Sequence, residues 1–125
     1  MAFVLNKDLI DSDEIETMEL VKGRAITIKI RWLDQETTIM NVYAPNRRQD
    51  HQEFWDKVKE EYKEAYRHNP EFILGDFNVT ENVIDRFPPK PDNAEATTAL
   101  RDFRIALEVH NQWRHEYPKA REYTY

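Results

Sequence analysis

The stretch "ILGDFNVT", residues 73–80, contains one of only two glycines in a chain of 125 residues. Gly75 ends an apolar run and directly precedes Asp76, and Asn78 follows two residues later. Glycine permits a sharp turn or a close backbone approach. Asp offers a charged acceptor to a water molecule or a metal, and Asn offers both donors and an acceptor. At the end of a buried strand these residue types are well placed to meet a ligand.

The same octet also has a purely structural interpretation. Asp and Asn are common turn residues because their side chains bond to nearby backbone groups. Short motifs often occur without the function they are associated with. On these residues alone, a turn is the favoured interpretation of Asp76 and Asn78.

Composition limits the possible classes of protein. A chain of 125 residues with 40% hydrophobic and 12% aromatic content is long enough for one domain with a core. Its net charge of −6 produces no overall attraction to nucleic acid or acidic membranes, so phosphate chemistry would need a local site or a metal. The absence of cysteine excludes disulfides and thiolate zinc sites. With short apolar runs and no secretory signal pattern, a soluble intracellular protein without a membrane partner is expected.

Three segments have the composition of strands. "TTIMNVYAP", residues 37–45, is rich in β-branched residues, and we expect it to pair antiparallel with residues 23–32 across a turn at "DQE". "FILG", residues 72–75, predicts a short, fully buried strand because four residues pass without a polar one. "GRAITIKIRW", residues 23–32, alternates and predicts a half-buried strand with these residues on one face: Ile26, Ile28, Ile30 and Trp32.

A first helix is expected to begin near Asp50, with Glu53 completing a capping box. Apolar side chains recur at helical spacing along it and predict an aromatic buried stripe. The residues of this stripe are Phe54, Trp55, Val58 and Tyr62.

A second helix is expected to begin at Asp92, with Glu95 three residues on. The proline-rich "DRFPPKPDN" before it cannot form a regular element. The last residues, "YTY" at 123–125, have the composition of a strand's beginning. One face of the second helix carries Ala96, Leu100, Phe103 and Leu107.

Other polar residues are weaker candidates for a site. Tyr43 and Asn46 in "NVYAPN" end a strand and could donate to a phosphate oxygen, although packing and turn roles are commoner for them. The four histidines lack metal-ligand spacing, and His51 is expected to be solvated at its helix end. Asp85 and Arg86 are expected to have a structural role, either as a local ion pair or in orienting the proline-rich loop.

Taken together, these motifs resemble a known family. "NVYAPN", then "FILGDFN", then a helix, "QWR" and "YTY" are similar to the endonuclease/exonuclease/phosphatase superfamily, most closely the exonuclease III-like and retrotransposon-type endonucleases. The resemblance extends from "AFVLN" to "YTY". It implies an α/β (α+β) fold, a four-layered α/β/β/α sandwich of two mixed sheets with outer helices. Residues 1–125 would form a single partial domain.

The resemblance also implies roles for particular residues. Asp76 would orient or deprotonate the attacking water, and Asn78 would help hold that water and the scissile phosphate. Tyr43 and Asn46 match positions that contact the phosphate. Mg²⁺ or a similar cation would be the cofactor. DNA or another phosphodiester would be the substrate, which is compatible with a nuclear location.

The chain departs from the family pattern in several ways. The family uses an early Asn and a metal-binding Glu before the segment matching "AFVLN", and a late Asp and an Asp-His pair after "YTY", and this sequence has none of them. Asn111 stands where close relatives tend to carry Asp. The sequence therefore predicts an internal fragment, truncated at both ends, with no assigned metal ligand and no activity in isolation.

The preferred interpretation is metal-dependent phosphodiester hydrolysis by a retrotransposon-type DNA endonuclease. One alternative is a phosphatase of the same superfamily acting on small phosphoesters, which substrate-reading loops would distinguish. The other is a noncatalytic remnant or binding fragment, which the flanking genomic sequence would distinguish. The residues named so far do not separate these three.

Overall fold

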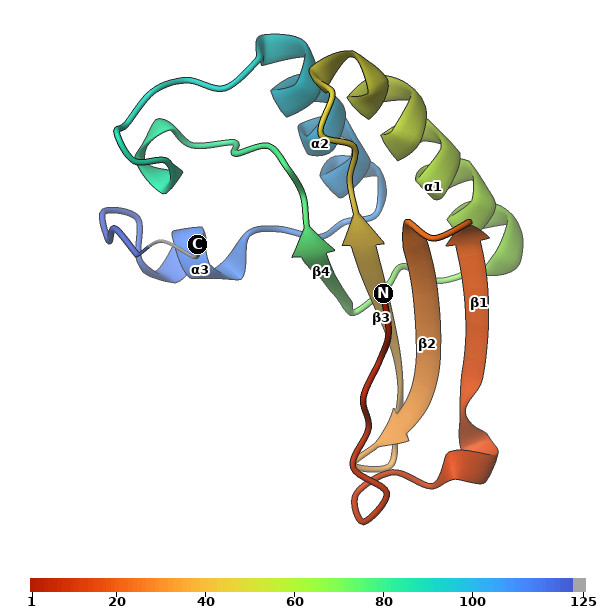
Figure 1. Ribbon diagram of the computed structural model, residues 1–125. Helices are drawn as coiled ribbons and strands as arrows, with labels where there is room; N and C mark the ends of the chain where they lie inside the picture. The colour runs from red at the N-terminus through yellow and green to blue at the C-terminus, as the bar shows by residue number, and fades with distance from the viewer. Residues whose placement is uncertain (123–125) are drawn as a thin grey trace.

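The computed structural model describes residues 1–122, in which one four-stranded sheet carries two helices on one face (Figure 1). The strands, in spatial order, are β1 (Glu16–Val21), β2 (Ala25–Trp32), β3 (Gln35–Tyr43) and β4 (Phe72–Asp76). The helices are α1 (His51–Ala65), α2 (Ala94–Ala106) and the short α3 (Gln112–Glu116), with 3-10 turns η1 (Ser12–Glu14), η2 (Arg48–Asp50) and η3 (Val83–Asp85). The strand expected at residues 123–125 lies outside the described residues.

The first three strands form an antiparallel meander, and β4 pairs parallel to β3 after the chain has passed through α1. The antiparallel pairing of β2 with β3 confirms the prediction. The turn between them is tighter than expected, because Trp32 already pairs with Gln35. Leu33 and Asp34 form the whole connection with positive φ angles of 48° and 63°, as two-residue hairpin loops require.

Both predicted helices are present, and their predicted buried faces meet over the sheet. Trp55 lies at the centre of this core, with its ring 4.8 Å from Phe54, 4.7 Å from Phe103 and 5.9 Å from Phe77 between centroids. The expected caps differ in detail. Asp50 makes no side-chain cap bond. The second helix is capped by Asn93 and not by Asp92, and the Asn93 side chain accepts a hydrogen bond from the backbone N–H of Ala96.

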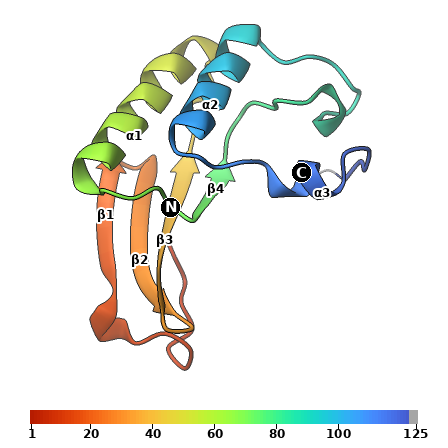
Figure 2. The same cartoon turned by 180° about the vertical axis from the view of Figure 1, so that it is seen from behind.

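The sheet is covered on both faces near β2, so the prediction of a half-buried strand was wrong. Ala25 and Thr27 are fully buried on the helix side. The N-terminal segment crosses the opposite face, as the two views from front and back show (Figures 1 and 2). Alternation records which side chains are apolar, but Ala and Thr are small enough to be buried without contributing to that pattern. The apolar side chains on this opposite face form a second cluster, separate from the core around Trp55: Phe3, Leu5, Ile10, Ile15, Ile28, Ile30 and Ile39.

The strand β4 was expected to be fully buried, and this was also wrong. It lies at the edge of the sheet, next to β3 alone among the described strands. Ile73 packs against the helix-side core, whereas Phe72 is 59% exposed and Leu74 is 44% exposed on the other face. A continuous apolar run indicates that both faces suit burial, but it cannot show what covers each of them.

Gly75 allows the backbones of β4 and β3 to approach closely. Its φ angle is 131°, outside the range that other residues adopt easily. A Cβ atom built at this position would lie 1.9 Å from the carbonyl oxygen of Val42, its partner in the strand register. No side chain can occupy that space, so only glycine permits this register.

We therefore expect Gly75→Ala to destabilise the fold strongly. Backbone strain at such a position costs about 1–3 kcal/mol, and separating the strands to relieve the clash adds to it. Gly23→Ala is the matched control, because Gly23 also has a positive φ of 66° but nothing lies within 4 Å of its Cβ position. We expect a loss of about 1–2 kcal/mol there. Chemical denaturation of both variants tests this, and equal losses would contradict the proposed clash.

Candidate functional site

Two strand-end loops meet where β3 and β4 end, and they carry the predicted motifs. Tyr43 pairs with Asp76 in the strand register, and the next backbone N–H, that of Ala44, donates to the Asp76 carbonyl at 2.8 Å. The side-chain amide of Asn78 donates back to the Ala44 carbonyl at 2.8 Å. Because the carboxyl ends of parallel strands share one edge of a sheet, the two motifs lie side by side.

The carboxylate of Asp76 is exposed and only partly used by the fold. Its Oδ1 accepts from the backbone N–H of Asn78 at 3.0 Å, which is the turn role that its residue type suggests. Within the described residues Oδ2 makes no hydrogen bond, so it can accept one from a water molecule. The structural role and a chemical role therefore use different oxygens of the same group.

Asn78 holds a left-handed backbone conformation, with a φ angle of 51°. Asn tolerates this region better than most residues. One amide N–H is committed to Ala44, while the side-chain carbonyl makes no hydrogen bond within the described residues. Val79, which follows, is buried in the main core and anchors the loop.

Tyr43 lies at this edge, but Asn46 is less closely associated with it. The Tyr43 ring is 41% exposed, and the Arg24 guanidinium carbon lies 5.4 Å from its centroid. Arg24 also donates to the Tyr43 carbonyl at 3.2 Å, which places a positive charge beside the loops. No motif in the sequence singles out Arg24, although the predicted hairpin places it opposite the end of β3. Asn46 is exposed, and no described interaction connects it with Asp76.

A buried carboxylate supports the loop from behind. The Asp92 side chain is 2% exposed and accepts from the backbone N–H groups of Thr80, at 3.1 Å, and Asn93, at 2.9 Å. It also pairs with Arg86. Burial alone would raise the pKa of Asp92, but these backbone donors and the Arg86 charge outweigh burial and hold the pKa below its usual value. Asp92 thereby ties the loop after β4 to the start of α2.

The expected ion pair between Asp85 and Arg86 does not form. Arg86 turns to Asp92, and Asp85 pairs instead with Arg114 near α3. Each residue finds another partner, so the ion-pair prediction was wrong, whereas the pair of Arg86 with Asp92 spans the proline-rich loop and agrees with the alternative that these residues orient it. Neighbouring positions in the sequence did not favour the pair, because Asp85 ends the 3-10 turn η3 and the chain continues from it in an extended conformation at Arg86.

His51 was expected to be solvated, but it is fully buried at the start of α1. The indole N–H of Trp55 donates to its Nδ1 at 3.3 Å. Burial lowers the pKa of His51, partly opposed by the Pro45 carbonyl and by the charges of Asp92 and Asp50. The ring is therefore held neutral behind the "NVYAPN" loop.

This burial predicts a loss of stability in mild acid. The folded pKa of His51 lies below its unfolded value of about 6.5. As pH falls through about 6.5, the unfolded chain takes up the proton first, and folding stability falls by at most about 1.4 kcal/mol per pH unit. His51→Asn keeps an acceptor for the Trp55 indole N–H but cannot titrate, so unfolding free energy should depend less on pH in this range. Unfolding free energies measured between pH 7.5 and about 5 test it, and an unchanged slope in the variant would contradict it.

The described residues contain no group of three or more His, Asp or Glu side chains that could hold a metal ion. No helix in the described part of the chain is long and apolar enough to cross a membrane. The carboxylate of Asp76 and the amide carbonyl of Asn78 are two side-chain oxygen donors on the paired loops. Carboxylate and amide oxygens are ligands that Mg²⁺ accepts, often beside several waters and a substrate phosphate.

The sheet and its helices form a mixed α+β fold, and a solved structure shares it. A search of solved structures found the "Endonuclease domain of TRAS1, a telomere-specific non-LTR retrotransposon", with a TM-score of 0.55 and 14% identity. The match covers 80% of this chain and 45% of that domain.

A sequence relative agrees with this structural likeness. The chain is 27% identical over 123 residues to the "Transposon TX1 uncharacterized 149 kDa protein" of Xenopus laevis. The match covers 97% of this chain but only 9% of that relative. No protein-family model matches the chain. The two matches confirm the predicted resemblance to retrotransposon-type endonucleases.

Proposed function

We propose that this chain supplies part of the catalytic centre of a metal-dependent phosphodiesterase, most specifically a DNA endonuclease of the retrotransposon type. The observation that carries the proposal is the mutual bonding of the two strand-end loops through Ala44, Asp76 and Asn78. The two matches, one to a transposon protein and one to a retrotransposon endonuclease domain, support a nuclease over other uses of this fold.

In this proposal each residue uses the atoms that the fold leaves available. Oδ2 of Asp76 accepts a hydrogen bond from the attacking water and takes its proton as general base. The Asn78 side-chain carbonyl holds the same water, and the second amide N–H donates to a phosphate oxygen. Tyr43 and Asn46 donate to the remaining phosphate oxygens, where negative charge develops in the transition state.

Mg²⁺, or a similar divalent cation, needs only one or two protein carboxylates, and it therefore fits these donors. Asp76 provides one carboxylate, and Mg²⁺ commonly binds through one or two carboxylates together with waters and substrate phosphates. When bound, the cation would offset the charge of the phosphate and of the leaving oxygen. It would also reconcile phosphate chemistry with a net charge of −6.

We also propose that the sheet face carrying Phe72 and Leu74 is covered in the larger domain by a second sheet, giving the four-layered sandwich. Both side chains are large, apolar and about half exposed in this chain. The chain spans 45% of the solved endonuclease domain, which leaves enough polypeptide for another layer. Two sheets that pack face to face bury such inward side chains between them.

The hydrolytic role is tested in a longer polypeptide that contains this chain and the remainder of the endonuclease fold. We expect Asp76→Asn to slow Mg²⁺-dependent nicking of supercoiled DNA by about 10²–10⁴-fold, because a general base contributes that much. Asp102→Asn, which removes an exposed carboxylate from α2, is the control and should nick normally. Equal nicking by both variants would disprove the assigned role. Hydrolysis of small phosphoesters without nicking would favour a phosphatase.

The second-sheet proposal is tested by Leu74→Ala in two contexts. In this chain Leu74 is 44% exposed, so we expect a change in unfolding free energy within about 1 kcal/mol. In the longer polypeptide the same side chain would be buried, and its truncation should cost about 2–5 kcal/mol. Denaturant titrations of both proteins measure the difference. The same small cost in both would show that nothing covers this face.

A further inference from the structure

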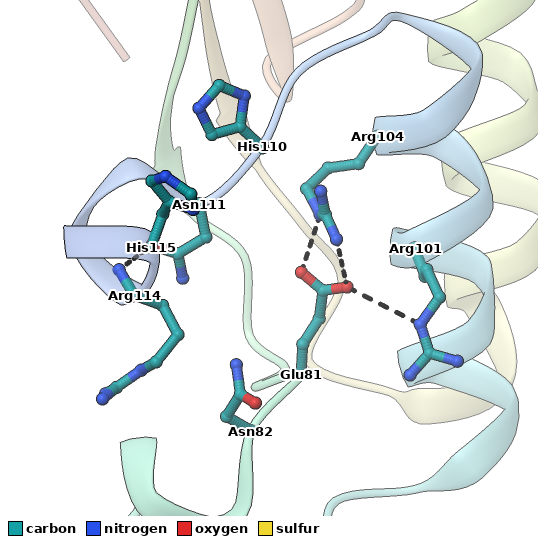
Figure 3. A pocket seen from close by; sticks show the side chains of 8 residues that line it. All are labelled: Glu81, Asn82, Arg101, Arg104, His110, Asn111, Arg114 and His115. Atoms are coloured by element: carbon teal, nitrogen blue, oxygen red, sulfur yellow. Dashed lines mark hydrogen bonds and ion pairs between the residues drawn. The ribbon is translucent and has the colours of Figure 1, made fainter. Parts of the chain in front are cut away.

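A second polar site lies beyond the paired loops, in a cavity of about 360 Å³. Its wall is formed by the second half of α2, by α3 and by the segment that follows β4 (Figure 3). This volume is at the lower end of the range for small-ligand sites, about 300–1,000 Å³. The charged and titratable residues that line it are Glu81, Arg101, Arg104, His110, Arg114 and His115.

The lining of this cavity has the opposite charge to the chain as a whole. Three arginines and one carboxylate line it, and Asp85 just outside offsets Arg114, which leaves an excess of one positive charge with both histidines counted as neutral, whereas the whole chain carries −6. Two Asn side chains complete the lining and add no charge. A concave surface lined by one sign of charge raises the local concentration of ions of the opposite sign.

Two of the arginines are fixed by the fold. Arg104 donates from Nε and Nη2 to Glu81 at 2.7 and 2.9 Å, and from Nη1 to the Val109 carbonyl at 3.0 Å. Arg114 is 11% exposed, pairs with Asp85 and donates to two backbone carbonyls of the following turn. These side chains shape the cavity and provide charge, but most of their donors are already used.

Arg101 differs from both of them. Its side chain is 52% exposed, and its Nε lies 3.9 Å from Glu81 Oε1, beyond hydrogen-bond length. Figure 3 shows Arg101 and Arg104 reaching Glu81 from the same helix, and the contact of Arg104, at 2.7 Å, is the shorter of the two. Glu81 is bonded at both oxygens by Arg104, whereas Arg101 makes only the longer ion pair, so the donors of Arg101 are the ones most available to a ligand.

We propose that this cavity binds a phosphate group through Arg101. The guanidinium fork matches two phosphate oxygens, and Arg104 adds fixed positive charge behind it. Glu81 lies on the segment that leaves Asp76 and Asn78, so the cavity adjoins the loop of the candidate site. Free phosphate or the backbone of a nucleic acid strand can supply the group. Only the nucleic acid source rests on the proposed function.

The test measures binding by this chain in metal-free buffer containing EDTA, where hydrolysis cannot contribute. Inorganic phosphate is titrated by NMR, and a fluorescein-labelled oligonucleotide is titrated by fluorescence anisotropy at several salt concentrations. We expect Arg101→Ala to weaken binding several-fold. For the oligonucleotide, losing one phosphate contact should also reduce the slope of log affinity against log salt by about 0.7–0.9.

Arg31→Ala is the matched control. Arg31 is 58% exposed and has one ion pair, with Glu14 at 3.4 Å, so it resembles Arg101 in exposure and in partner. It lies at the end of β2 and outside the cavity lining. This control should bind both ligands as the parent does.

Glu81→Gln should have the opposite effect on phosphate affinity. It removes the carboxylate that competes for the arginines while keeping an acceptor for Arg104, so phosphate should bind more tightly. Circular dichroism and thermal unfolding of each variant show that the fold is retained.

The outcomes show which source supplies the phosphate, and they distinguish the cavity proposal from the proposed hydrolytic function. Arg101-dependent binding of the oligonucleotide supports nucleic acid as the source, and Arg101-dependent binding of inorganic phosphate alone supports free phosphate. Parent-like binding of both ligands by Arg101→Ala, or no binding by the parent, would overturn the cavity's role. The nicking assay with Asp76→Asn uses Mg²⁺ and a longer polypeptide, whereas the binding assay uses this chain without metal. A negative result in the nicking assay would therefore leave the phosphate-binding proposal standing.

Discussion

The close backbone contact between Gly75 and Val42 is the constraint on which the candidate site depends. A side chain at residue 75 would collide with a carbonyl oxygen of β3, so this register exists only with glycine there. The register places the Asp76 carbonyl within reach of the Ala44 N–H, and the following turn brings Asn78 back to the Ala44 carbonyl. One missing side chain therefore aligns two motifs separated by about thirty residues in the sequence.

Polar groups buried behind these loops make the arrangement rigid. Asp92 joins the loop after β4 to the start of α2, and neutral His51 fills the space between the "NVYAPN" loop and Trp55. A buried polar group is costly unless it is bonded, and Asp92 is bonded by two backbone N–H groups and by Arg86. The same groups make the loop geometry sensitive to acid, since protonating either residue opposes the native state.

The candidate site was predicted only in part from the sequence. Asp76 and Asn78 stood out through their spacing after Gly75, and the structure places Tyr43 beside them. The supporting charges were missed or misassigned, because their partners are distant in the sequence. Arg24 reaches the site across a hairpin. The arginine cavity is assembled from three segments, none of which carries a phosphate-binding motif of its own.

Both helices, their buried faces and the antiparallel pairing of β2 with β3 are encoded in local sequence patterns. These features depend on local periodicity and turn chemistry, which residues a few positions apart encode. Contacts between distant segments decide that β4 is an edge strand, that His51 is buried and that Asp85 pairs with Arg114. An apolar pattern shows which side chains favour burial. What covers them, and which charges meet, depends on contacts between distant segments that only the folded chain brings together.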